Sequence, residues 1–207
     1  MQLTIPAVGI LRGVEGTFFR EVMHASFSAG LQALEITMNT DGAVDILSGC
    51  RPEVPEGKWL GMGTIRNLEE ARQAVGAGAM FLVTPNTDPA VIDYAGQQEV
   101  PVIAGAFTPT EVYNAWSAGA VMVKVFPCGP VGPSYIKELK GPFDHIPLLA
   151  VGGVNRENLD EYFKAGVSGV GVSSALFGAK ALAEKDISQV GVNVRDFVMA
   201  LGDCISG

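Results

Sequence analysis

Short apolar runs recur along the chain at intervals of 20 to 26 residues, and segments with helical spacing lie between them. Such alternation is typical of strands that are each followed by an amphipathic helix, and it predicts a parallel sheet. Eight runs are expected to be strands: residues 7–11, 33–37, 59–62, 80–83, 101–104, 121–125, 147–151 and 168–172.

Four of the intervening helical segments end in the same two-residue signal, an alanine followed by a glycine. This signal fits a helix C-cap with glycine at the first position beyond the helix. The repetition predicts an α/β fold, a single-domain (β/α)8 TIM barrel over residues 1–207. An open doubly wound sheet is the alternative, but no glycine-rich dinucleotide-binding turn follows the first strand. The four pairs are Ala29-Gly30, Ala77-Gly78, Ala118-Gly119 and Ala165-Gly166.

The composition narrows the class of protein. Hydrophobic residues make up 48% of the 207 residues and charged residues 17%, which argues against disorder. We expect no transmembrane span, since no apolar run reaches about 18 residues, and the N-terminus has no signal-peptide pattern. A net charge of −8 without a basic stretch argues against nucleic acid as a partner. Three cysteines without metal-ligand spacing indicate a reducing, cytoplasmic location.

In a barrel of this kind, reactive side chains collect where the strands end, at their carboxyl termini. The predicted strands therefore define a set of candidate residues at one face of the barrel. They are Arg12, Glu35, Thr37, Asn39, Thr64, Thr84, Pro85, Asn86, Lys124, Phe126, Pro127, Gly152, Gly153, Ser173 and Ser174.

Lys124 is the most informative candidate because it interrupts the apolar run VMVKVF. A buried, unpaired lysine lowers its pKa or acquires a partner. Moving the pKa from about 10.4 toward 7 takes roughly 4–5 kcal/mol, much of which burial can supply. A neutral amine can then attack a carbonyl and form an imine. The local pattern leaves two interpretations open: a nucleophile, and a structural lysine paired with a carboxylate.

Glu35 lies in the predicted strand ALEIT, where alternation places it on the same face as Ala33 and Thr37. Strands two and six are both even-numbered, so Glu35 and Lys124 can fall in one layer of the barrel and face each other. A carboxylate opposite an imine-forming lysine can move the protons that this chemistry requires. The alternative is a salt bridge that neutralises two buried charges.

Two further groups of residues suggest anion binding. Barrels often bind phosphate with the loops after strands seven and eight, where this chain has Gly152-Gly153 and Ser173-Ser174. Tight turns with an N-cap serine are the alternative. Arg12 can clamp a substrate carboxylate, or it can form a salt bridge at the rim.

His24 and His145 do not lie at strand ends, so no histidine metal site is expected.

Taken together, these residues resemble the class I aldolases that act on 2-keto-3-deoxy-6-phosphogluconate and 4-hydroxy-2-oxoglutarate. The resemblance covers nearly the whole chain. The matching motifs are ILRG at 10–13, LEIT at 34–37, GMGTI at 61–65, VTPN at 83–86, VKVFP at 123–127, GPSYIKELKGPF at 132–143, VGGV at 151–154 and KAGVSGVGVSSALF at 164–177.

The resemblance implies a role for each matched residue. It implies that Lys124 forms the Schiff base and that Glu35 is the general acid and base. It places Thr64, Pro85 and Phe126 around a pyruvate moiety, and Gly152, Gly153 and Ser174 at a phosphate. It further implies a homotrimer, a 2-keto acid substrate, and neither a metal nor a cofactor.

The chain departs from many gluconate-type members at two positions, where Asn39 replaces an arginine and Val151 replaces a threonine. Carboxylate binding then passes to Arg12, and both replacements look more like members that act on the galactonate epimer. Ser173 also stands where relatives often have glycine.

The expected reaction is reversible cleavage to pyruvate and glyceraldehyde 3-phosphate, with 4-hydroxy-2-oxoglutarate, which gives pyruvate and glyoxylate, as a further possible substrate. Two rivals stay open. One is a phosphosugar epimerase or isomerase of the same fold, and the other is a non-catalytic sugar-phosphate binding protein.

Overall fold

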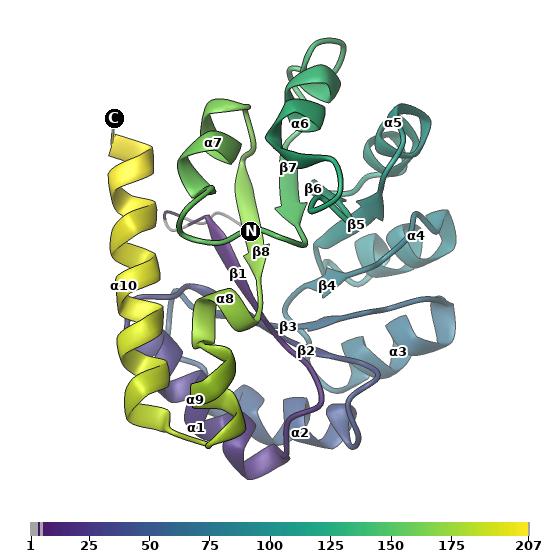
Figure 1. Ribbon diagram of the computed structural model, residues 1–207. Helices are drawn as coiled ribbons and strands as arrows, with labels where there is room; N and C mark the ends of the chain where they lie inside the picture. Colours follow the sequence, from purple (N-terminus) through teal and green to yellow (C-terminus); the bar gives the residue numbers. More distant parts are fainter. Residues whose placement is uncertain (1–3, 5, 207) are drawn as a thin grey trace.

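The computed structural model describes residue 4 and residues 6–206, which form a closed barrel of eight parallel strands (Figure 1). The strands follow one another around the barrel in chain order, and β1 pairs with β8 to close it. They are β1 (Ala7–Leu11), β2 (Ala33–Thr37), β3 (Trp59–Gly63), β4 (Leu82–Val83), β5 (Val102–Ala106), β6 (Met122–Val125), β7 (Leu148–Val151) and β8 (Gly169–Val172).

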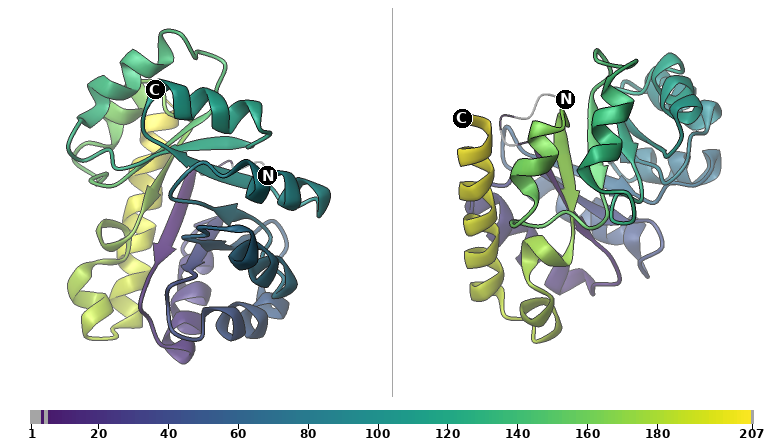
Figure 2. Two further views of the ribbon diagram at one scale, coloured as in Figure 1. Left: turned by 90° about the vertical axis from the view of Figure 1, so that its right-hand side faces the viewer. Right: turned by 45° about the horizontal axis from the view of Figure 1, so that its top comes forward.

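Helices surround the barrel on its outer face, as both views in Figure 2 show. The long C-terminal helix α10 lies alongside α1 and next to α8, so it covers the seam where the barrel closes (Figure 1). The helices are α1 (Gly16–Ser28), α2 (Ala43–Cys50), the 3-10 helix η1 (Arg51–Glu53), α3 (Leu68–Gly76), α4 (Pro89–Gln97), α5 (Pro109–Ser117), α6 (Gly132–Lys140), α7 (Leu159–Lys164), α8 (Ser174–Phe177), α9 (Ala179–Ala183) and α10 (Ile187–Ser206).

The closed parallel barrel confirms the predicted fold class, and all eight predicted strands are present. Two strands run further than expected, to Gly63 and Ala106, because glycines at their ends weaken the apolar pattern. The four alanine–glycine signals are helix ends: the glycines have φ of 104°, 92°, 104° and 100°. Such left-handed backbone favours glycine at a C-cap.

The inside of the barrel is filled by a separate apolar cluster that includes Phe81, Ile103 and Leu149. The strands make room for its large side chains with glycine. A Cβ at Gly61 would lie 2.6 Å from the Phe81 ring, so only glycine fits there. The interior of the barrel between its two ends is therefore packed rather than open.

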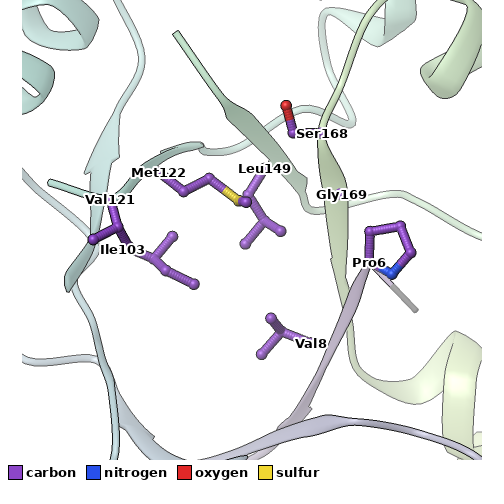
Figure 3. Close-up of a pocket in the computed structure, with 8 residues that line it drawn as sticks. All are labelled: Pro6, Val8, Ile103, Val121, Met122, Leu149, Ser168 and Gly169. Atoms are coloured by element: carbon purple, nitrogen blue, oxygen red, sulfur yellow. The ribbon is translucent and has the colours of Figure 1, made fainter. Parts of the chain in front are cut away.

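A small cavity of about 70 Å³ lies at the opposite, amino-terminal end of the barrel (Figure 3). Apart from Ser168, its lining side chains are apolar, and they come from strands on both sides of the barrel axis. None of the described residues that line it carries a titratable side chain. Among the described residues, no helix is both long and apolar enough to cross a membrane.

Candidate active site

A cavity of about 480 Å³ opens at the carboxyl ends of the strands. Side chains and loops from β1, β2, β3, β4, β6, β7 and β8 line it. The barrel thus brings together residues that lie up to 165 positions apart in the chain, from Ile10 to Ala175. All ten site residues expected from the sequence are among those that line this cavity: Arg12, Glu35, Thr64, Pro85, Lys124, Phe126, Gly152, Gly153, Ser173 and Ser174.

Lys124 projects from the middle of β6 and is 6% exposed. Burial lowers the pKa of its amine, the Glu35 carboxylate opposes that shift, and the charge on Arg12 adds to it. The Nζ lies 5.0 Å from the centroid of the Phe126 ring, which forms one wall beside the amine. A lysine with a lowered pKa holds more of its amine in the neutral, nucleophilic form.

Glu35 is 1% exposed, and among the described residues its Oε2 has no hydrogen-bond partner. Burial raises the pKa of this carboxyl to about 7, although Lys124 and Arg12 both lower it. Near neutral pH the group can therefore either hold or release a proton, as an acid–base catalyst must. None of the ion pairs among the described residues includes Glu35 or Lys124. The two residues therefore do not form the salt bridge that was the alternative interpretation.

The neighbouring strand makes space for this carboxylate. Gly63 at the end of β3 pairs with Thr37, and a Cβ at Gly63 would lie 2.1 Å from Oε1 of Glu35. The space that the carboxylate occupies thus exists only because residue 63 has no side chain.

A second glycine brings the loop after β4 to the cavity. A Cβ at Gly105 would lie 2.3 Å from the carbonyl carbon of Pro85. The Thr84 hydroxyl accepts from the Gly105 N–H at 2.9 Å and donates to the Asn86 carbonyl at 2.6 Å. Thr84 and Asn86, both strand-end candidates, therefore hold the loop that presents Pro85 and do not line the cavity.

Arg12 lies at the rim, exposed to solvent, and its guanidinium donates to the Thr64 hydroxyl at 3.4 Å. Among residues 4 and 6–206 it forms no ion pair, so the rim salt bridge considered above is not present. Thr64 has φ of 58°, an unusual conformation for a β-branched residue. Strain of this kind concentrates at functional sites.

The loop after β7 carries Gly152 and Gly153, with φ of 93° and 81°. In the described part of the chain, their N–H groups donate no hydrogen bond. A Cβ at Gly153 would lie 2.7 Å from the Cα of Gly129, so the backbone approaches closely here. Ser173 and Ser174 are exposed beside it, and Ser173 makes no side-chain capping bond. These donors remain available to a ligand.

The other chemically reactive side chains lie outside the cavity. His24 pairs with Glu53 at 2.8 Å, and His145 pairs with Asp144 at 3.2 Å. The thiol of Cys128 is buried, which raises its pKa to about 11. Among the residues described, no group of three or more His, Cys, Asp or Glu side chains is arranged to hold a metal ion.

Sequence reasoning missed one polar residue of the cavity, Asn155, which follows Gly153 by two positions. Its signal was present, because it is a polar residue close to a strand end. The strand-end candidates Thr37, Asn39 and Pro127 also do not line the cavity. Asn39 borders a separate hollow that includes Gly13 and Asp41. The lining residues outside the expected site set are otherwise apolar or glycine: Ile10, Val151, Val154, Gly171, Val172 and Ala175.

Known proteins resemble this chain over most of its length. The family described as KDPG and KHG aldolase matches residues 10–192. The chain is 33% identical over 198 residues to the 2-dehydro-3-deoxy-6-phosphogalactonate aldolase of Escherichia coli, covering 95% of this chain and 96% of that protein. It is 31% identical over 167 residues to a 2-dehydro-3-deoxy-phosphogluconate aldolase of Treponema pallidum, covering 80% and 79%.

Among solved structures, one described as native KDPGal superposes with a TM-score of 0.93 at 30% identity, covering 100% of this chain and 99% of that one. A family match over most of the chain, relatives of this identity and the same barrel all agree. The chain therefore belongs to the KDPG and KHG aldolase family.

Proposed function

We propose that this protein is a class I aldolase that reversibly cleaves a 2-keto-3-deoxy-6-phospho-sugar acid to pyruvate and glyceraldehyde 3-phosphate. One observation carries the proposal: a buried lysine with a lowered pKa and a buried glutamate with a raised pKa share one cavity. Opposite shifts of this kind are typical of an acid–base pair with divided roles.

In the first step, the neutral amine of Lys124 adds to the C2 ketone, and loss of water gives a protonated imine. This cation withdraws electrons from the C3–C4 bond. Burial favours the step because it lowers the pKa of the amine and so increases the fraction that is unprotonated. Phe126, whose ring lies beside Nζ, and Pro85 would enclose the three carbons of the pyruvate moiety.

In the second step, the Glu35 carboxylate takes the proton from the C4 hydroxyl while the C3–C4 bond breaks. The aldehyde leaves, and the electron pair of the broken C3–C4 bond stays on the pyruvate fragment as an enamine on Lys124. Glu35, now protonated, returns the proton to C3, and water then hydrolyses the imine to release pyruvate. A pKa of about 7 suits both the acceptance and the return of one proton near neutral pH.

The two anionic ends of the substrate would bind at opposite sides of the cavity. Arg12, supported by Thr64, provides the cation for the carboxylate. The free N–H groups of Gly152 and Gly153, with the hydroxyls of Ser173 and Ser174, provide donors for the phosphate. A protein of net charge −8 must bind anions with such local donors.

Two observations favour the galactonate epimer. The galactonate aldolase of Escherichia coli matches over more of the chain than the gluconate aldolase does. Val151 lines the cavity as an apolar residue, whereas the gluconate-type resemblance has threonine there. Asn39, which lies outside the cavity, gives less support.

The proposal is tested by initial rates on the gluconate- and galactonate-derived phosphates and on 4-hydroxy-2-oxoglutarate, with released pyruvate coupled to lactate dehydrogenase. We expect pyruvate from all three, fastest from the galactonate epimer, and none from Lys124→Arg. Substrate bound without pyruvate would instead indicate a binding protein, and an isomerised product without pyruvate an epimerase.

We also propose an oligomeric state and a cellular location for the protein. Family resemblance supports a homotrimer, and exposed apolar side chains such as Tyr113 and Met199 offer surface for subunit contacts. Three chains of 21.7 kDa would give about 65 kDa by sedimentation, whereas a single-chain mass would contradict the trimer. Three free cysteines, none in a disulfide, support a cytoplasmic location.

A further inference from the structure

The loop after β7 is held by two asparagines that exchange hydrogen bonds. The Asn155 N–H donates to Oδ1 of Asn158 at 2.9 Å, and the Asn158 N–H donates to Oδ1 of Asn155 at 3.1 Å. The Nδ2 of Asn158 also donates to the Gly153 carbonyl at 2.9 Å. The pair lies in the loop that precedes α7, which begins at Leu159. It also fixes the carbonyl of Gly153, a residue that lines the cavity.

Asn155 itself lines the cavity and is half-buried. Since its Oδ1 accepts from the Asn158 N–H, the orientation of the amide is set, and Nδ2 is the group left to donate. Within the described part of the chain, that nitrogen makes no hydrogen bond. Asn155 therefore adds an unused, oriented donor next to Gly153.

The charges around the cavity make such a donor valuable. The only cationic side chains that line it among the described residues are Arg12 and Lys124. Arg156 follows Asn155 in sequence, but its guanidinium lies 3.6 Å from the Asp196 carboxylate. A phosphate in the loop after β7 would thus be held by neutral donors, and its affinity would depend on how well they are oriented.

We infer that Asn155 is a phosphate-binding residue that donates through Nδ2, and that Asn158 is the residue that positions both Asn155 and Gly153. The inference deepens the proposed function and rests on it. It assigns to the loop after β7 a side-chain donor in addition to the glycine backbone.

Two substitutions of Asn155 separate binding from loop support. Asn155→Asp keeps an Oδ acceptor for the Asn158 N–H but replaces Nδ2 with a negative oxygen. Asn155→Ala removes both groups. If Asn155 only supports the loop, the aspartate variant behaves like the wild type. If it binds phosphate, the aspartate variant is the more impaired, since the carboxylate repels the phosphate.

The measurement is the KM for the aldehyde in the synthetic direction with saturating pyruvate, using glyceraldehyde 3-phosphate and unphosphorylated glyceraldehyde. We expect Asn155→Ala to raise the KM for the phosphorylated aldehyde roughly tenfold, as for a lost hydrogen bond to a charged group, and Asn155→Asp to raise it further. The KM for glyceraldehyde stays unchanged. Asn67, which caps α3 by accepting from the Glu70 N–H at 3.0 Å and does not line the cavity, gives matched controls in Asn67→Ala and Asn67→Asp.

Equal effects on both aldehydes, or a wild-type KM for Asn155→Asp, would overturn the inference. The wild-type enzyme distinguishes this failure from others. If it shows no preference for the phosphorylated aldehyde, both the proposed phosphate subsite and the proposed role of Asn155 fail. If pyruvate neither adds to an aldehyde nor exchanges its methyl protons with solvent, the aldolase proposal itself fails.

Discussion

At the scale of single residues, the properties of the site follow from the effect of burial on the pKa values of two oppositely charged groups. Burial disfavours the charged form of each group, so it lowers the pKa of Lys124 and raises that of Glu35. The mutual attraction of the two groups works against both shifts but does not cancel either. The Glu35 carboxylate thus lies where burial disfavours its charge, with one oxygen unpartnered among the described residues. The proposed acid–base role gives a reason for a carboxylate at this position.

Glu35→Gln tests this cost. The folded-state pKa of Glu35 is raised from 4.5 to about 7, so the folded protein binds the extra proton between these values. Its stabilising contribution is complete below about pH 4.5 and is lost as the pH rises through 7. We expect the unfolding free energy of Glu35→Gln, relative to the wild type, to increase between pH 5 and pH 8 by an amount on the order of a few kcal/mol. Urea denaturation at the two pH values measures it.

The same variant should still form the imine with pyruvate, while C3–C4 cleavage falls by roughly 10²–10⁴-fold, the usual contribution of a general base. A stability difference that is independent of pH would show that Glu35 is ionised throughout. Unimpaired cleavage would remove it from the mechanism.

At the scale of elements, a glycine without a side chain and a hydrogen-bonded loop position the residues of the site. β3 ends in Gly63, and the missing side chain is what lets the carboxylate from β2 stand in the barrel mouth. The loop after β1 is fixed differently: the Gly13 N–H donates to the Thr40 hydroxyl at 2.9 Å, and Thr40 lies 3.1 Å from the buried Thr37 hydroxyl. Arg12 is thus held between a strand and an anchored glycine.

Gly63→Ala is expected to displace the Glu35 carboxylate, because the new methyl group would lie 2.1 Å from Oε1. A misplacement of about 1 Å lowers kcat by roughly 10²-fold, while borohydride trapping of pyruvate persists. Gly76→Ala is the matched control, since a methyl group there meets nothing within 4 Å. A wild-type kcat for Gly63→Ala would mean that Glu35 does not need its present position.

Thr40→Val removes the acceptor of the Gly13 N–H, and we expect the KM for the keto acid to rise several-fold with kcat little changed. Thr40→Ser should restore the wild-type KM because it keeps the hydroxyl. In an Arg12→Ala background the Thr40 substitution should have no further effect on KM. An equal effect in both backgrounds would show that Thr40 does not act through Arg12. Thr110→Val, on the exposed face of α5, is the control.

At the scale of the whole molecule, much of the account could be predicted from the sequence. Strand spacing and glycine C-caps identified the barrel because both follow from local backbone rules, and strand ends then converge on one face. Alternation along the strands placed Glu35 and Lys124 inside. Gly63 could not be found in this way, since its role depends on a contact between two strands that no local pattern encodes. Asn155 carried a signal, as a polar residue close to a strand end, but its hydrogen bonds with Asn158 are not part of that pattern.

The central claim is that Lys124 forms a covalent imine with the keto acid. Borohydride reduction in the presence of pyruvate, followed by peptide mass analysis, tests it most directly. Lys58 is the internal control: burial also lowers its pKa, but it lies just before β3, at the opposite end of the barrel, and donates to the Leu31 carbonyl at 2.8 Å. We predict one reduced pyruvate adduct, on Lys124, that persists in Lys58→Arg and is absent from folded Lys124→Arg. No adduct, or an adduct on another lysine, would contradict the account.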